Sequence, residues 1–254
     1  AKILGNEIDM IYDGSADKFS HIDGIANWKF DKNLAYAHIC SNNTIYGSQY
    51  PIYPNTGDVP LIADMSSDFM SRPFDINKFG LVFAGAQKNI GPAGATVVIM
   101  RKDLAARCPS TVPTMLRYTT HIDQRSLFNT PSTFGIYMIR LVTDWLVGLG
   151  GLPAIQAMNE AKAAKLYAAI DACDFYRGTV AKGSRSLMNV TFRIKEGDED
   201  LEKKFVAEAK AAGLIGLKGH RAVGGLRASI YNAMSAEGID ALVEFMNAFA
   251  KANG

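Results

Sequence analysis

Residues 81–94 read LVFAGAQKNIGPAG, and this stretch decides the fold. Leu81–Ala84 is a short run that is apolar on both faces, which is typical of a strand buried inside an α/β sheet. Lys88 follows among small residues, and glycines at 85, 91 and 94 allow a tight turn or a close approach of the backbone to a ligand. The stretch therefore predicts a buried strand that leads into a glycine-rich loop carrying a lysine.

Three further apolar runs predict other strands of the same sheet. They are LAYAHIC at 34–40, LIA at 61–63 and ATVVIM at 95–100. The runs at 81–84 and 95–100 are separated only by residues 85–94, which is too short for a crossover helix, so these strands are either antiparallel or not neighbours. Residues 42–60 are rich in Asn, Gly, Pro and Tyr and predict a long loop, and such loops in compact domains are usually functional.

Helical spacing of apolar residues dominates the second half of the chain. It predicts helices at 131–150, 153–170, 201–213 and 239–249, with strands at 189–194 (NVTFRI) and 226–231 (LRASIY). Trp145 lies on the apolar stripe of the first of these helices, and we expect it to be a core residue. The pattern predicts an α/β unit over residues 1–148 and a smaller α+β domain over residues 149–254.

Composition excludes several classes of protein. With 254 residues, 48% apolar and 20% charged, the chain is typical of a globular protein, and its formal net charge of +2 gives no electrostatic footprint for nucleic acid. No apolar run approaches the roughly 20 residues that a membrane span needs. Neither the histidines at 21, 38 and 121 nor the cysteines at 40, 108 and 173 have metal-binding spacing, so we expect no metal site. The cysteines form no disulfide framework and suit a reducing, cytoplasmic compartment.

Lys88 and Asp64 are the first candidates for chemistry. Each follows a predicted buried strand, and the carboxyl ends of such strands border the crevice in which α/β sheets bind ligands. Lysine amines form Schiff bases with pyridoxal phosphate (PLP), and an acid that keeps the pyridine nitrogen protonated lets the ring act as an electron sink. Taken alone, Lys88 is more often a solvated loop lysine and Asp64 a turn residue.

Four motifs then make the sequence recognisable. They are DMSSDFMSRP (64–73), FAGAQKNIGPAG (83–94), FNTPSTF (128–134) and KGHRAVGGLRASIYNA (218–233). In this order and spacing they resemble the phosphoserine aminotransferases, a family of class V, fold type I enzymes that use PLP. The resemblance covers essentially the whole chain. It implies an α/β fold in which a partial, mixed-sheet PLP-binding large domain precedes a small α+β C-terminal domain.

The resemblance also implies a role for each matched residue. Lys88 matches the catalytic Schiff-base lysine and Asp64 the acid beside the pyridine nitrogen. The other cofactor-binding matches are Gln87, Thr44 in the loop SNNTIYG, and Asn129 with Thr130, which would reach the cofactor phosphate of a neighbouring subunit. The family has Asn-Glu-Thr where this chain has Asn42-Asn43-Thr44, which is a mild departure.

The remaining matches lie in the predicted small domain. Arg227 matches the arginine that holds the substrate α-carboxylate, a task suited to its planar, bidentate fork. His220 and Arg221 match residues that bind the substrate phosphate or distal carboxylate. From the residues alone, His220-Arg221 is equally compatible with an exposed turn, and Arg227 with a structural salt bridge.

The implied reaction is reversible transamination between L-glutamate and 3-phosphohydroxypyruvate, giving O-phospho-L-serine and 2-oxoglutarate in serine biosynthesis. A homodimer with shared active sites is implied as well. Family members extend further at the amino end, where they carry a glycine-rich phosphate turn, a ring-stacking aromatic residue and more cations for substrate phosphate. Ala1–Leu4 followed by Gly5 is typical of the last turn of a helix, so we expect the chain to be truncated and weakly active alone.

Two other functions are compatible with the sequence. The first is a non-catalytic remnant of the fold that serves as a binding or scaffold module. The second is another class V PLP enzyme. The intact Lys88, Asp64 and Arg227 favour the aminotransferase over the remnant. The motif GHRAVGGLRASIYNA provides for a second anionic group on the substrate and argues against another class V activity.

Overall fold

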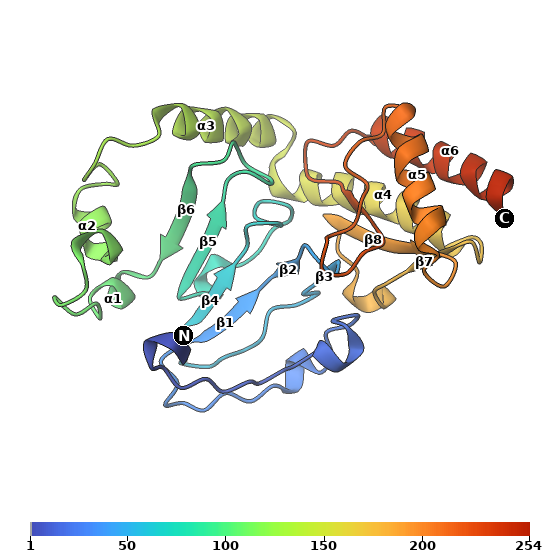
Figure 1. Cartoon of the computed structure of the whole chain (residues 1–254). Coiled ribbons are helices and arrows are strands. Elements are labelled where there is room, and N and C mark those ends of the chain that lie inside the picture. The colour runs from blue at the N-terminus through green and yellow to red at the C-terminus, as the bar shows by residue number, and fades with distance from the viewer. Residues whose placement is uncertain (1) are drawn as a thin grey trace.

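The computed structural model describes residues 2–254, which fold around a four-stranded and a three-stranded sheet, with a small antiparallel pair of strands within residues 42–49 as a third sheet (Figure 1). The first sheet has the strand order β1-β4-β5-β6. Its strands are β1 (Ala37–Cys40), β4 (Leu61–Asp64), β5 (Leu81–Gly85) and β6 (Thr96–Met100). The strands β1, β4 and β5 are parallel, whereas β6 is antiparallel to β5. Of the two arrangements open for β5 and β6, the structure has the antiparallel one, joined by the glycine-rich loop.

Parallel pairing brings the ends of three strands to one edge of this sheet. Cys40 lies opposite Asp64, and Asp64 lies opposite Phe83 two residues before the end of β5. Because carboxyl ends of parallel strands meet at one edge, Asp64 and the loop after β5 lie at the same edge of this sheet. The core beneath them is a cluster of buried apolar residues that includes Ile39, Leu61 and Val82.

Two expectations about burial in the first unit are wrong. ATVVIM was expected to be buried on both faces, but β6 is the last strand of its sheet, and Val98 and Ile99 are 39% and 41% exposed. Trp145 was expected in the core, yet it is 41% exposed on α3 (Thr133–Gly148). This helix is covered on one side only, and it turns Leu146 inward and its apolar stripe outward.

Short elements connect the strands of the first unit. They are β2 (Asn42–Asn43), β3 (Ser48–Gln49), α1 (Lys102–Ala105), α2 (Tyr118–Asp123) and the 3₁₀ turns Lys2–Leu4, Ser15–Asp17, Ile25–Asn27, Ile76–Lys78 and Thr114–Leu116. Of the helical turn predicted at the start of the chain, Ala1 lies outside the described residues. Lys2–Leu4 form a 3₁₀ turn, and Gly5 follows in the left-handed region with φ of 77°.

The second unit has an antiparallel sheet, β7-β8-β9, with helices on one face. Its elements are α4 (Gly151–Asp171), β7 (Tyr176–Gly178), the 3₁₀ turn Lys182–Ser184, β8 (Asn189–Ile194), α5 (Glu199–Ala211), β9 (Leu226–Ser229) and α6 (Ala236–Asn253). Phe192 of β8 packs on Phe205 of α5 in a fully buried cluster with α4 and α6. The strand NVTFRI occupies the predicted residues, and Asp198 caps α5 by accepting from the backbone of Asp200 and Leu201.

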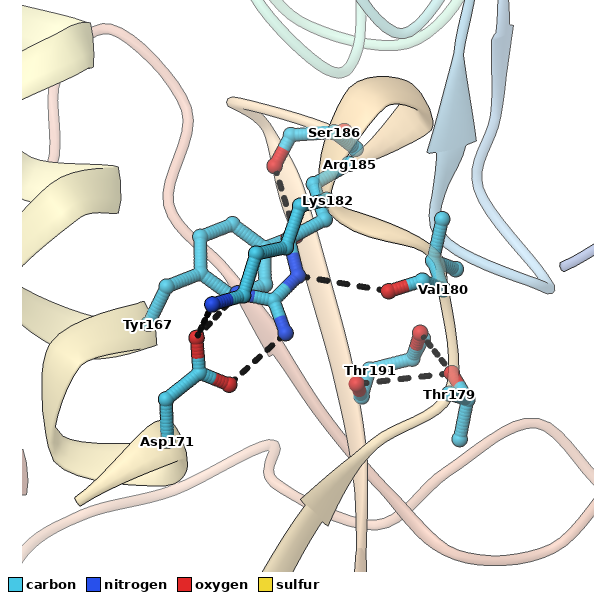
Figure 2. Close-up of polar contacts among 8 residues, drawn as sticks. All are labelled: Tyr167, Asp171, Thr179, Val180, Lys182, Arg185, Ser186 and Thr191. Carbon is cyan, nitrogen blue, oxygen red and sulfur yellow. Dashed lines mark hydrogen bonds and ion pairs between the residues drawn. The ribbon is translucent and has the colours of Figure 1, made fainter. Parts of the chain in front are cut away.

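An arginine clamp fixes the outer edge of the second sheet (Figure 2). Arg185 forms a bidentate pair with Asp171 at 2.7 Å for both bonds, and its guanidinium stacks 4.4 Å from the centre of the Tyr167 ring. Hydrogen bonds from Arg185 hold the pKa of Asp171 below its usual range. The Tyr167 hydroxyl donates to the Ser186 carbonyl. Helix α4 is thereby tied to the segment that enters β8.

The two units meet through buried side-chain amides, which we call the polar interface. Asn42 donates to Asn189 and accepts from Ser186, whereas Asn232 donates through its backbone to Asn89 and through its side chain to Met70. Asn159 adds a bond to Asn232 and another to the Ser71 carbonyl. Every one of these contacts except the Asn159–Asn232 bond joins a residue before 148 to a residue after it, so the polar interface ties the two units together.

Lys162 is a buried cation beside the polar interface. It is 5% exposed on α4, and its Nζ donates to the carbonyls of Tyr231 at 2.9 Å and Met234 at 3.0 Å. Burial disfavours the charged form and lowers the pKa of Lys162 to about 8. Lys162 therefore holds the turn after β9 in place, but removing its ammonium group from water lowers the stability of the fold.

This lowered pKa predicts a pH dependence of stability. Since the folded chain binds this proton more weakly than the unfolded chain, the free energy of unfolding should rise as the pH goes from about 8 to the ordinary lysine value of 10.5. The variant Lys162→Met should lose that part of the rise. Urea denaturation of both proteins across this range measures the difference, and two parallel curves would contradict the assignment.

No single helix in the described part of the chain is long and apolar enough to cross a membrane. By length and composition, α3 and α4 pass that test only as a pair bent by 83°. Among residues 2–254 there is also no group of three or more His, Cys, Asp or Glu side chains that could hold a metal ion.

Candidate active site

Lys88 lies in a turn that begins where β5 ends. The backbone N–H groups of Ile90 and Gly91 donate to the Ala86 carbonyl, and the Ala86 N–H donates to Ala95 at the start of the return strand. The half-buried Lys88 Nζ donates to Thr44 Oγ1 at 3.0 Å. It forms no ion pair with any carboxylate of residues 2–254, so its amine is available for covalent chemistry.

Asp64 stands on the neighbouring strand at the same edge. Its carboxylate accepts from the Ser66 N–H at 2.9 Å, and Ser66 Oγ accepts from the Gly85 N–H at 3.0 Å. Asp64 is thereby tied to the strand that carries Lys88. Burial, followed by the negative charge of Asp64, raises the pKa of the Cys40 thiol to about 11, and Lys88 opposes this shift. Both Asp64 and Lys88 thus lie near enough to Cys40 to influence its thiol.

The loop that presents Thr44 is held from below by a buried carboxyl group. Asp68 accepts from the Ser41 hydroxyl and from Gln49 Nε2 at 3.0 Å, and its burial raises its pKa above the usual range. Gln49 Oε1 accepts in turn from the Leu187 N–H in the second unit. These bonds fix both ends of residues 41–49 and so fix the position of Thr44.

Arg227 reaches the same loop from the second unit. Its Nη1 donates to the Thr44 carbonyl at 3.2 Å, while its buried Nε has no hydrogen-bond partner among residues 2–254. A buried guanidinium N–H without a partner is costly, and an anionic ligand would satisfy it. Thr44 thus connects the amine of Lys88 through its side chain with the guanidinium of Arg227 through its backbone.

A cleft of about 570 Å³ opens beside Arg227. His220 and Tyr46 line it, and His220 Nδ1 accepts from the Ala222 N–H at 3.2 Å. Arg221 is exposed and is not part of this lining. The structure therefore separates the predicted pair, with His220 at the cleft and Arg221 outside it.

The other predicted cofactor contacts form no hydrogen bond with Lys88 within residues 2–254. Gln87 is exposed and close to Gly85, where an added Cβ would come within 2.7 Å of Gln87 Oε1. Asn129 and Thr130 are exposed on the segment between α2 and α3, and Asn129 Nδ2 donates to the Thr130 carbonyl. No hydrogen bond within residues 2–254 links this pair to Lys88.

Reasoning from the sequence missed two parts of this region. Arg177 lines the cleft from a three-residue strand, and a lone arginine in YRG gives no signal of its own. Asn232 belongs to the motif that ends in IYNA, but only the fold shows that it contacts Asn89, the residue after Lys88.

The donor set fits PLP. Lys88 has an amine that donates to the hydroxyl of Thr44 and can form a Schiff base. The Asp64 carboxylate suits a pyridine nitrogen. The unpartnered Nε–H of Arg227 suits an anion. Lys88 follows β5, Asp64 ends β4 and Arg227 lies on β9, and Lys88 and Arg227 are linked through Thr44.

Comparison with known proteins agrees with this geometry. The family model for class-V aminotransferases matches residues 5–242. The chain belongs to the class-V aminotransferase family, and its structure is that of a fold type I aminotransferase, as predicted.

The similar proteins narrow this class to phosphoserine aminotransferases. The chain is 54% identical over 247 residues to that of Lysinibacillus sphaericus, a match covering 97% of this chain and 67% of the relative. It is 53% identical over 255 residues to the phosphoserine aminotransferase of Desulfatibacillum aliphaticivorans, a match covering 100% of this chain and 70% of the relative.

Solved structures give the same result. The phosphoserine aminotransferase of Bacillus circulans subsp. alkalophilus superposes with a TM-score of 0.92 at 52% identity, covering 94% of this chain and 66% of that one. A PLP-bound phosphoserine aminotransferase from Trichomonas vaginalis superposes with a TM-score of 0.82 at 41% identity, covering 87% of this chain and 62% of that one. The chain thus spans about two thirds of the length of these relatives.

Proposed function

We propose that this chain carries the machinery for PLP-dependent amino transfer between L-glutamate and 3-phosphohydroxypyruvate, giving O-phospho-L-serine and 2-oxoglutarate. One observation carries the proposal. Thr44 bonds to Lys88 Nζ and to Arg227 Nη1 at once, which sets a covalent anchor for a cofactor beside a carboxylate-binding guanidinium. The high identity to phosphoserine aminotransferases supports the choice of substrates.

The chain's own residues divide the work. When bound, PLP supplies an aldehyde for the amino group and an electron sink for the substrate α-carbon. Lys88 first holds the cofactor and, once released, carries the proton to and from the substrate as base and then acid. Asp64 keeps the pyridine nitrogen protonated. The Thr44 hydroxyl, which accepts from Lys88, is placed to orient the ring.

Both substrates of this reaction carry an α-carboxylate, for which Arg227 provides a bidentate fork. His220 faces the second anionic group from the cleft, and in this proposal Arg221 acts on the same group from outside it. Gln87 contacts the cofactor phosphate. Asn129 and Thr130 would complete that phosphate site in the neighbouring subunit of a homodimer, which is consistent with their exposed position. Cys40, Cys108 and Cys173 are all free, which suits the reducing cytoplasm.

Spectroscopy of the purified chain tests this proposal. Addition of PLP should give the visible band of cofactor bound to a lysine amine, and glutamate should then shift it as the amino group moves to the cofactor. We expect weak binding by this chain alone and tighter binding when the amino-terminal part of a relative is supplied as a second polypeptide. Absence of the band in both preparations would overturn the proposal and favour a non-catalytic binding module.

A further inference from the structure

One segment of the second unit bonds to both sides of the candidate site. Residues 227–232, which we call the β9 segment, begin with the arginine whose Nη1 donates to the Thr44 carbonyl at 3.2 Å. They end with Asn232, whose backbone N–H donates to Asn89 Oδ1 at 2.9 Å. Because Asn89 follows Lys88 directly, this short segment carries a guanidinium at one end and binds the neighbour of the Lys88 amine at the other.

The turn that carries Lys88 has little backbone support of its own. It is closed by the N–H groups of Ile90 and Gly91, which both donate to the Ala86 carbonyl. Between these ends, the backbone N–H and C=O groups of residues 87–89 form no hydrogen bond within the described chain. Side chains must therefore fix this part of the turn.

Asn89 is a side chain that can do so. It is 7% exposed, and its Nδ2 donates to the Phe69 carbonyl at 2.7 Å while its Oδ1 accepts from Asn232. Both ends of the amide are thus bonded, one to each unit of the chain. A buried amide that loses such a partner is left unsatisfied at a high energetic cost, so the two bonds together favour one position of Asn89.

The partner of Asn89 is itself held in place. The buried Asn232 side chain donates to the Met70 carbonyl at 2.9 Å and accepts from Asn159 at 2.8 Å. The Nζ of Lys162 donates to four backbone carbonyls around Asn232. The backbone N–H of Asn232 is therefore presented to Asn89 from a fixed place.

Position matters at Lys88 because its amine has two tasks in the proposed function. It first holds the cofactor and then carries a proton to and from the substrate. A displacement of about 1 Å can lower the rate of such a step about a hundredfold. The Lys88 Nζ lies 3.0 Å from Thr44 Oγ1, in the loop to which Arg227 also bonds. A bond that holds the turn against the β9 segment therefore holds the amine at a set distance from the guanidinium.

We propose that Asn89 is a positioning residue, which sets the place of the Lys88 amine relative to Arg227 through its bond to Asn232. This inference rests on the proposed function for the tasks of Lys88 only. Both polar atoms of the Asn89 side chain are engaged by the protein, so Asn89 acts through Lys88 and not by contact with substrate or cofactor. Its loss should slow proton transfer without weakening the binding of glutamate.

Chemical modification of the chain without cofactor tests the position of the amine. Acetic anhydride labels lysines, and mass spectrometry compares the rate at Lys88 with that at the exposed Lys78. In Asn89→Ala the relative rate at Lys88 should rise about fivefold, as expected when an amine loses one hydrogen bond of ordinary strength. Asn89→Asp keeps an oxygen for the Asn232 N–H and should restore most of the parent rate. If Asn89→Ala does not fold, Asn89→Ser, whose hydroxyl is too short to reach Asn232, takes its place.

Asn159→Ala is the matched control. It removes a similarly buried amide from the polar interface but leaves the bond between Asn232 and Asn89 in place, so the rate at Lys88 should stay that of the parent. An unchanged rate in Asn89→Ala would overturn the proposal. An equal rise in Asn159→Ala would do the same, because the amine would then follow the interface as a whole.

Rapid-mixing kinetics of the PLP-loaded protein with glutamate give the second readout. The rate of amino transfer in Asn89→Ala should fall about a hundredfold, while the glutamate concentration at half-maximal rate stays unchanged. A rise in that concentration at an unchanged rate would place Asn89 in binding and contradict the positioning role. If the parent takes up no PLP, the proposed function fails, whereas the labelling of the cofactor-free chain still decides the role of Asn89.

Discussion

Lys88→Ala is expected to abolish the visible band that forms when PLP is added, because the covalent bond to the cofactor needs the Nζ amine. Lys88 is the lysine that combines partial burial with a position beside Thr44 and the Asp64 strand. Lys88→Arg retains a positive charge but cannot form the imine bond, and it should fail in the same way. The effect is therefore a loss of attachment rather than a graded change in affinity.

Borohydride reduction followed by mass spectrometry measures this loss directly. In the parent chain the reduced cofactor should be found on the peptide that contains Lys88. Lys78→Ala removes an exposed lysine from the turn Ile76–Lys78 and should leave this labelling intact. Stoichiometric labelling of another lysine in Lys88→Ala would show that the anchor has been assigned to the wrong residue.

Phe205→Ala should cost about 3–5 kcal/mol of folding free energy, as large-to-small changes of buried aromatic residues do. Phe205 is fully buried, with ring centroids of Phe245 and Phe249 at 5.1 Å and that of Phe192 at 6.1 Å. A loss of this size is a large fraction of the roughly 5–15 kcal/mol that stabilises an ordinary domain. The second unit should lose most of its stability.

Two optical signals distinguish the two units. Trp28 and Trp145 both lie before residue 148, so tryptophan fluorescence follows the first unit, whereas circular dichroism is dominated by α4, α5 and α6. In urea, Phe205→Ala should shift the dichroism midpoint more than the fluorescence midpoint. Equal shifts of both midpoints would mean that the chain unfolds as one cooperative body and would contradict an independent domain over 149–254.

Local pattern predicted the elements better than it predicted their surroundings. The strands at 61–64, 81–85 and 189–194 follow from apolar runs because burial on both faces requires such residues. The same logic misplaced Trp145 and the 95–100 strand. Periodicity shows which residues share a face but not whether another element covers that face.

The site was predictable where a motif carried it. Lys88 and Arg227 both bond to Thr44, and Asp64 lies at the same edge of the sheet as the loop that carries Lys88, whereas their roles stay predictions. Arg177 could not be found in this way, because its place in the cleft depends on the register of β7 against β8. Arg221 shows the opposite case, in which a motif residue does not lie where the motif predicts: its neighbour His220 lines the cleft, whereas Arg221 does not.

The polar interface also determines how this protein can be recombined. Apolar surfaces tolerate sliding and substitution, whereas buried amides must each find a partner at a defined angle. A chimera that joined residues 1–148 to the second unit of a distant aminotransferase would remove the bonds of Asn42 to Asn189 and Ser186 and the bond that Asn89 accepts from Asn232. Transplanting Asn159, Ser186, Asn189 and Asn232 as a set should restore the match. These four positions thus determine which first units can pair with this second unit.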